Sequence, residues 1–146
     1  MIASVAEFGE RLKEIDPEDD HFNYKVDRVI EELAPGLAES VYPAVFAYYE
    51  ANPESYCGCP GSLTHLVEHY DPNYIPALKE SVRRMPSQAS VLMINRILNS
   101  ELNEAERAEY MEILREVAKD ESIPWEVSEA AEEYLKRREE IDGEEG

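Results

Sequence analysis

The stretch Ser87-Gln88-Ala89-Ser90-Val91-Leu92-Met93-Ile94-Asn95-Arg96-Ile97-Leu98-Asn99 decides the fold of this chain. Its apolar residues recur at the spacing of an α-helix, and they cover more than one face of that helix. A helix that is apolar on several sides has to be buried by its neighbours. The stretch therefore predicts a helix at the centre of an all-α domain, with Pro86 just before its start.

Three polar residues interrupt this apolar helix, namely Asn95, Arg96 and Asn99. Burying them is costly unless they are paired. They could form a strip that contacts a partner, or an internal network in which Arg96 meets a carboxylate such as Glu68. We favour the internal network.

Helical spacing also dominates the rest of the chain, and convincing strand alternation is absent. The expected helices, besides 87–99, cover residues 2–15, 23–33, 37–51, 62–70, 72–84, 103–118 and 124–140. Pro43 must kink the third of these or lie near its true start. We expect Asp71-Pro72 to begin the helix over 72–84, and Trp125 to pack in the core with the last helix.

About seven or eight short helices with tight turns predict helical hairpins, stacked as in HEAT-type repeats or gathered into an irregular bundle. Both arrangements stay open at this point. We expect one helical domain over residues 1–140 and an acidic tail over 141–146.

The charge of the chain is strongly unbalanced. It has 33 acidic and 14 basic residues in 146, with a formal net charge of −19. Such a field repels nucleic acids and anionic membranes, and it favours a basic partner. It also favours a monomer before a complex forms. Because the chain lacks a long apolar segment and a secretory signal pattern, we expect a cytoplasmic protein.

Two motifs suggest metal chemistry. His65-Leu66-Val67-Glu68-His69 has the H-x-x-E-H pattern of zinc peptidases, in which two histidines bind zinc and the glutamate activates water. Cys57 and Cys59 could add thiolate ligands, but their spacing is shorter than that of structural zinc sites. We expect no metal, no cofactor and no enzymatic activity, with zinc hydrolysis as the weakest alternative. Neither a glycine-rich phosphate loop nor a nucleophile elbow is present.

Tyrosines lie beside carboxylates around the longest loop signal, at residues 52–61. Tyrosine is enriched at protein interfaces because it combines apolar area with a hydroxyl group. The predicted partner-binding residues are Tyr48, Tyr49, Glu50, Glu54, Glu68, Asp71 and Tyr74. Several of the nine tyrosines are also expected in the core.

Three segments carry a resemblance to a known family: residues 44–53 (AVFAYYEANP), 60–68 (PGSLTHLVE) and 93–100 (MINRILNS). In this order the chain resembles small, acidic, all-helical immunity proteins of bacterial polymorphic toxin systems, including contact-dependent inhibition loci. The resemblance covers about residues 46–135. It implies a protein that binds a cognate toxin domain, often a basic nuclease-type enzyme, and occludes it. The alternative from another class is a helical-repeat adaptor that recruits a partner without inhibiting it.

Overall fold

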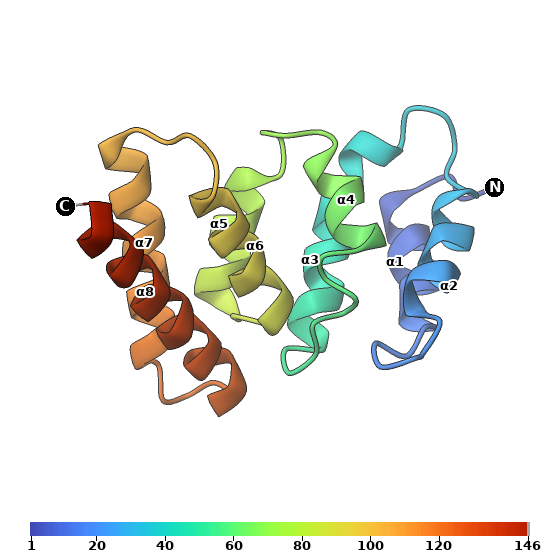
Figure 1. The fold of residues 1–146 in the computed structure, drawn as a ribbon. Coiled ribbons are helices and arrows are strands. Elements are labelled where there is room, and N and C mark those ends of the chain that lie inside the picture. Colours follow the sequence, from blue (N-terminus) through green and yellow to red (C-terminus); the bar gives the residue numbers. More distant parts are fainter. Residues whose placement is uncertain (146) are drawn as a thin grey trace.

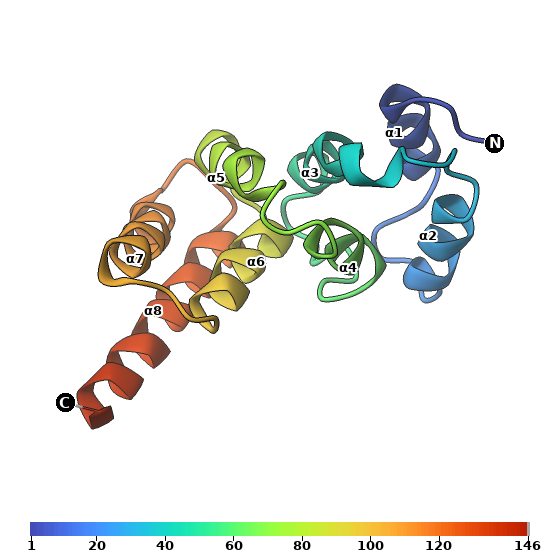
Figure 2. The ribbon, with the colours of Figure 1, turned by 90° about the horizontal axis from the view of Figure 1, so that it is seen from above.

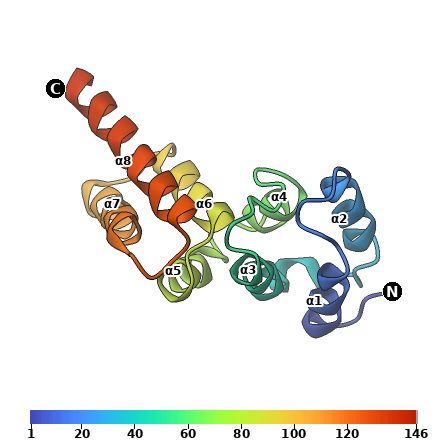
Figure 3. The ribbon, with the colours of Figure 1, turned by 90° about the horizontal axis from the view of Figure 1, so that it is seen from below.

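The helices of this protein stand side by side in a row of hairpins (Figure 1). A computed structural model describes the backbone of residues 1–145 and the side chains of residues 1–141. Over these residues the chain forms eight α-helices and no strand, which confirms the predicted all-α class. Views from above and below show two layers, with the odd-numbered helices in one and the even-numbered helices in the other (Figures 2 and 3). The hairpins are therefore stacked and do not form an irregular bundle.

One layer consists of every second helix, and each of its helices contacts the next in the row. These helices are α1 (Val5–Lys13), α3 (Tyr42–Ala51), α5 (Ile75–Arg84) and α7 (Glu104–Lys119). Pro43 lies in the first turn of α3, where the absence of its N–H leaves no helical hydrogen bond unmade. Pro43 thus marks the true start of this helix, and the residues before it form the short 3₁₀ helix η1 (Ala38–Ser40).

The other layer contains the remaining four helices: α2 (Phe22–Ile30), α4 (Ser62–Glu68), α6 (Gln88–Leu98) and α8 (Trp125–Glu145). Within this layer α2 contacts α4, and α6 contacts α8. The last helix runs past the predicted end near residue 140, and it extends beyond α6 in Figures 2 and 3. The predicted acidic tail at 141–146 falls mostly on side chains outside the described residues.

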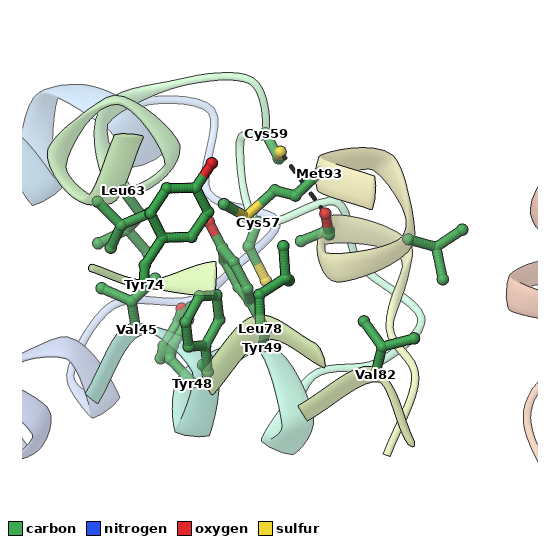
Figure 4. Close-up of a cluster of buried hydrophobic side chains, with 14 of the residues drawn as sticks. Val45, Tyr48, Tyr49, Cys57, Cys59, Leu63, Tyr74, Leu78, Val82 and Met93 are labelled. Atoms are coloured by element: carbon green, nitrogen blue, oxygen red, sulfur yellow. Dashed lines mark hydrogen bonds between the residues drawn. The ribbon is translucent and has the colours of Figure 1, made fainter. Parts of the chain in front are cut away.

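Helix α6 is buried as its sequence predicted. Val91, Met93 and Ile94 have no solvent-exposed surface, and α6 contacts α3, α5, α7 and α8. Figure 4 shows Met93 in the core beside Leu78 and Tyr74. The helix begins with a capping box, in which the Ser87 hydroxyl accepts a hydrogen bond from the Ser90 N–H at 3.0 Å.

The polar residues of α6 form the internal network that we favoured. Arg138 of α8 donates to the backbone oxygen of Asn95 at 3.0 Å and to its side-chain oxygen at 3.1 Å. The same guanidinium donates to the side chain of Asn99. One cation of α8 therefore satisfies the asparagines near the end of α6.

The first two helices are shorter than predicted for a common reason. Ile2 pairs with Leu33 in an isolated bridge, through Ile2 N–H to the Glu32 oxygen at 2.6 Å and Ala34 N–H to the Ile2 oxygen at 2.8 Å. Because this pairing needs extended backbone at both ends, α1 begins only after its cap at Ser4, and α2 ends before residue 33.

Helix α5 also begins later than predicted. Residues 70–74 form successive turns, and Tyr74, not Asp71, is the residue that precedes the first helical turn. Pro76 takes the first-turn position that was assigned to Pro72. Pro72 lies instead in the turns that precede the helix.

None of the helices in the described part of the chain is both long enough and apolar enough for a membrane crossing.

The central position of α6 predicts which substitutions weaken the fold. Ile94→Ala should lower the free energy of unfolding by about 2–5 kcal/mol, because Ile94 is fully buried and its loss leaves a cavity. Leu92→Ala on the same helix should cost clearly less, since Leu92 is only half-buried. Urea denaturation of both variants, followed by circular dichroism, checks this. Equal losses would contradict the burial of α6.

Candidate partner-binding surface

The tyrosines predicted to contact a partner belong to the core. Tyr48, Tyr49 and Tyr74 have exposed fractions of 6%, 0% and 4%, and Figure 4 shows all three rings among buried apolar side chains. Tyr48 donates its hydroxyl to the backbone oxygen of Ile15 at 2.5 Å, and burial raises its pKa above the ordinary value. A partner cannot reach these rings without opening the core. Their prediction as contact residues is therefore corrected.

This outcome has a simple physical reason. Helix α3 is apolar on nearly all sides, so burial of the helix takes the tyrosines with it. The Tyr49 hydroxyl lies 3.3 Å from the Thr64 hydroxyl, which gives the buried polar group a partner. A tyrosine next to a carboxylate in the sequence can still point to the opposite side of a helix.

The predicted carboxylates are divided between two opposite edges of the stack, where the loops between the helices lie. Glu54 lies exposed in the loop between α3 and α4, whereas Asp71 lies exposed in the loop between α4 and α5 (Figure 1). Glu50 holds α3 to α5, because it accepts two hydrogen bonds from Arg84 at 2.8 Å and one from Ser81 at 3.0 Å. The seven predicted residues do not form one continuous surface.

Glu68 forms the ion pair that the sequence suggested. Arg96 donates to its two carboxylate oxygens at 2.9 and 2.8 Å, which ties α4 to α6. The pKa of the Arg96 guanidinium is raised, mainly by its hydrogen bonds to Glu68, while burial acts in the opposite direction. Both side chains are partly exposed, at 34% for Arg96 and 23% for Glu68, so solvent screens the pair.

Beside this ion pair lies an acidic cleft of about 490 Å³, formed by the α4–α5 loop, the end of α6 and the start of α7. Its ionisable lining consists of four carboxylates, one guanidinium and two tyrosines: Glu68, Asp71, Glu101, Glu106, Arg96, Tyr74 and Tyr110. The carboxylates of Asp71 and Glu101 are exposed, and neither forms an ion pair with another described residue. The cleft can therefore receive a cationic group.

The other two acids of the cleft already have partners. Glu68 is neutralised by Arg96, and Glu106 caps α7 by accepting from the Asn103 N–H at 3.3 Å. Asn103 in turn accepts from the Glu106 N–H at 2.8 Å, which completes a capping box. Asp71 and Glu101 are thus the residues of the cleft that remain available. Glu101 had not been singled out in the sequence, because nothing local distinguishes it from the many other acids.

The two cysteines are structural side chains. Cys57 and Cys59 are free thiols in the core, and Thr64 donates its hydroxyl to the Cys59 sulfur at 2.9 Å. Burial raises the pKa of Cys57 to about 12 and that of Cys59 to about 11. Such thiols are mostly protonated at neutral pH and are poor nucleophiles and metal ligands.

The loop that carries these cysteines is held against α2. Asn23 accepts a hydrogen bond from the Ser62 N–H at 3.0 Å. A Cβ atom on Gly61 would lie 2.3 Å from the Gly58 backbone oxygen, and Gly58 itself has φ +69°. The glycines thus allow the loop to fold tightly over Asn23. This explains the Cys-Gly-Cys-Pro-Gly pattern without a metal.

The H-x-x-E-H motif is also placed by the structure. His65 and His69 are exposed, whereas Glu68 points to Arg96. Among the described residues, no three His, Cys, Asp or Glu side chains gather in a way that could hold a metal ion. The glutamate that would activate water in a zinc peptidase has a structural partner instead.

Sequence reasoning placed Trp125 in the core, but the structure exposes 68% of it. The buried stripe of α8 is Val127, Ala131 and Leu135, which are four residues apart. Trp125 lies off this stripe, because the residues one turn further on are Ser128 and Glu129. Extending the helical spacing from Trp125 would have revealed its exposure.

Comparisons of the chain with protein-family models, with curated proteins and with solved structures gave no match. The chain is thus defined by its own geometry as an acidic stack of helical hairpins with an open anionic cleft, and its function has to be argued from that surface.

The ion pair between α4 and α6 can be tested with a double-mutant cycle of Glu68→Gln and Arg96→Met. We expect a coupling free energy of roughly 1 kcal/mol, since the bidentate geometry is favourable but the pair is screened by solvent. Urea unfolding of the four proteins measures the coupling. Additive effects of the two substitutions would contradict a direct pair.

Burial of the cysteines predicts slow alkylation. At pH 8 the folded Cys59 should be thiolate in about one molecule per thousand, against roughly a quarter in the unfolded chain. Iodoacetamide labelling should therefore be at least ~100-fold slower without urea than with it, as measured by mass spectrometry.

The same shift gives the pH dependence of stability. The pKa of Cys59 is raised in the folded protein. Its buried thiol therefore contributes to the free energy of unfolding in full below the unfolded pKa of about 8.5, and this contribution is lost as the pH rises through about 11. The free energy of unfolding should fall between pH 8 and pH 10. The free energy of unfolding of the Cys59→Ala variant should fall less over this interval. An equal decrease in both proteins would contradict the raised pKa of Cys59.

Proposed function

We propose that this protein is an immunity-type inhibitor, which binds a basic toxin domain and blocks it by covering its active site or an essential surface. The observation that carries the proposal is the acidic cleft, where Asp71 and Glu101 are exposed and form no ion pair with another described residue. The resemblance of the sequence to immunity proteins supports the same function. The inhibitor would contribute no chemistry of its own.

Electrostatics favours such a partner. A net charge of −19 attracts a cationic protein over a distance of about one Debye length, roughly 8–10 Å at physiological salt. Steering of this kind mainly increases the rate of association, while the local pairing of charges selects the partner. A toxin that binds a polyanionic substrate has the cationic channel that would complement the cleft.

The shape of the molecule supports an adaptor as the second candidate. Stacked helical hairpins present extended surfaces that bind proteins in many contexts. The ribbon in Figure 1 has this form from α1 to α8. An adaptor would bind its partner without reducing the partner's activity, so the activity of the bound partner distinguishes the two functions.

The decisive experiment is co-purification of the protein with the product of the neighbouring gene, followed by binding and activity measurements. We expect one-to-one binding with loss of the partner's activity, and an association rate that falls at least ~10-fold between 0.05 and 0.5 M salt. No binding to any neighbouring gene product would reject the immunity function. Binding with full retention of activity would favour the adaptor.

Charge variants can locate the binding surface in the same assay. Asp71→Asn with Glu101→Gln should weaken binding by roughly 10-fold or more, because both carboxylates leave the cleft. The matched control is Asp27→Asn with Glu39→Gln, two exposed residues outside the cleft, which changes the net charge equally. Equal effects of the two double variants would mean that only the overall charge matters and that the cleft is not the contact.

A further inference from the structure

A second concave site lies on the opposite edge of the stack from the acidic cleft, at the other ends of the helices (Figure 1). The α3–α4 loop, the first turn of α6 and the first turns of α8 meet there (Figure 1). This Trp125 pocket has a volume of about 350 Å³ and is lined by Tyr56, Gln88, Trp125, Glu129, Glu133 and Tyr134, among others. It is at the small end of the range for ligand sites, about 300–1,000 Å³, and suits one side chain better than a large ligand.

Gln88 places an unsatisfied hydrogen-bond acceptor at this pocket. Its side chain lines the pocket and the residue is only 7% exposed, yet its amide oxygen has no hydrogen-bond partner among the described residues. The backbone N–H of Gln88 is satisfied by the Pro53 oxygen at 2.9 Å, so the deficit concerns the side chain alone. A buried acceptor without a donor is costly and rare in folded proteins. The missing group is therefore an N–H or O–H donor.

The carboxylates of the pocket favour a hydrogen-bond donor that carries a positive charge. Glu126, Glu129 and Glu133 lie on consecutive turns of α8, at the spacing where like charges repel along a helix. No described residue forms an ion pair with any of the three, although several other glutamates of the chain have one. A cation bound here would relieve this repulsion.

The aromatic rings restrict the kind of cation. Trp125 is 68% exposed and Tyr56 45% exposed, so both rings can be covered by a ligand. Tyr134 is half-buried in the same pocket, and burial, together with Tyr56, raises its pKa to about 12. Its phenol therefore stays neutral and can accept or donate a hydrogen bond. Tryptophan provides the strongest cation–π surface of the aromatic side chains.

We propose that the Trp125 pocket binds an arginine side chain of a protein partner. The guanidinium stacks on the Trp125 indole and directs N–H groups to Glu129 and Glu133. It donates a further N–H to the amide oxygen of Gln88 once a rotation of that side chain turns the oxygen towards the pocket, because this oxygen is buried in the unbound protein. Arginine fits better than lysine because its planar group offers five donors and a stacking face at once, whereas an ammonium is compact and more strongly hydrated. The proposal rests on the proposed function only in expecting a basic protein partner.

The pocket can be tested without any toxin. Trp125 is the only tryptophan of the chain, so its indole N–H resonance in ¹H–¹⁵N spectra reports on this site alone. N-acetyl-arginine amide should shift the resonance in a saturable way, with a dissociation constant on the order of millimolar. N-acetyl-citrulline amide, which is neutral and nearly the same shape, should give no saturable shift, and N-acetyl-lysine amide should bind at least fivefold more weakly, as an order-of-magnitude expectation.

Variants of the full chain give the second arm. Gln88→Leu, which keeps the volume but removes the acceptor, and Glu129→Gln with Glu133→Gln should each raise the dissociation constant by roughly fivefold or more. Glu104→Gln with Glu112→Gln on α7 is the charge-matched control and should leave the dissociation constant unchanged. Circular dichroism and the rest of the spectrum verify that each variant is folded.

Three results would overturn the arginine pocket: no saturation at about ten times the expected concentration, equal binding of citrulline or lysine, or unchanged affinity in both pocket variants. Each of these leaves the proposed inhibition untouched, because that function is measured with the toxin and is assigned to the acidic cleft on the opposite edge of the stack. Loss of toxin binding with an intact arginine response would instead reject the inhibitor and keep the pocket.

Discussion

The structure depends on the need to bury more than one side of α6. A helix with Val91, Ile94 and Leu98 on one face and Met93 on another is stable only if neighbours cover both faces. Helices α3, α5, α7 and α8 supply that cover, and the core continues without interruption from Ile2 to Leu135. Two layers result, because covering both sides of α6 requires helices in the same layer and in the layer behind it.

Arginines complete what the apolar contacts cannot provide. Arg96 joins α6 to α4, Arg138 joins α8 to the end of α6, and Arg84 joins α5 to α3. Each one satisfies two or more acceptors at once, which a planar guanidinium does better than an ammonium. In a chain with only 14 basic residues, these cations are thus committed to holding helices together. The excess of acids is left at the surface, where it can act on a partner.

The fold could be predicted further than the site. Helical spacing and the proline at the start of α3 are local signals, so they identified most helices. The pairing of Arg96 with Glu68 followed instead from the cost of burying an unpaired charge in an apolar helix. Partner contacts depend on which side of a helix faces solvent after packing, and that is a property of neighbours. The prediction for Tyr48 and Tyr49 was wrong although their segment is apolar on nearly all sides, which already indicates a helix covered by its neighbours. The prediction for Trp125 was wrong for another reason. Its position off the buried stripe of α8 could already be read from the helical spacing of the sequence.

The two sites differ in what they can select. In the acidic cleft, exposed carboxylates interact with any cation at an appropriate distance, so the cleft mostly affects the rate of encounter. In the Trp125 pocket, a buried amide oxygen and two aromatic rings impose direction and shape, so a wrong side chain leaves Gln88 unsatisfied. The uninterrupted core between them keeps the two sites at a fixed separation. A partner that uses both must match this separation, and a merely basic protein without a suitably placed arginine would engage only the cleft.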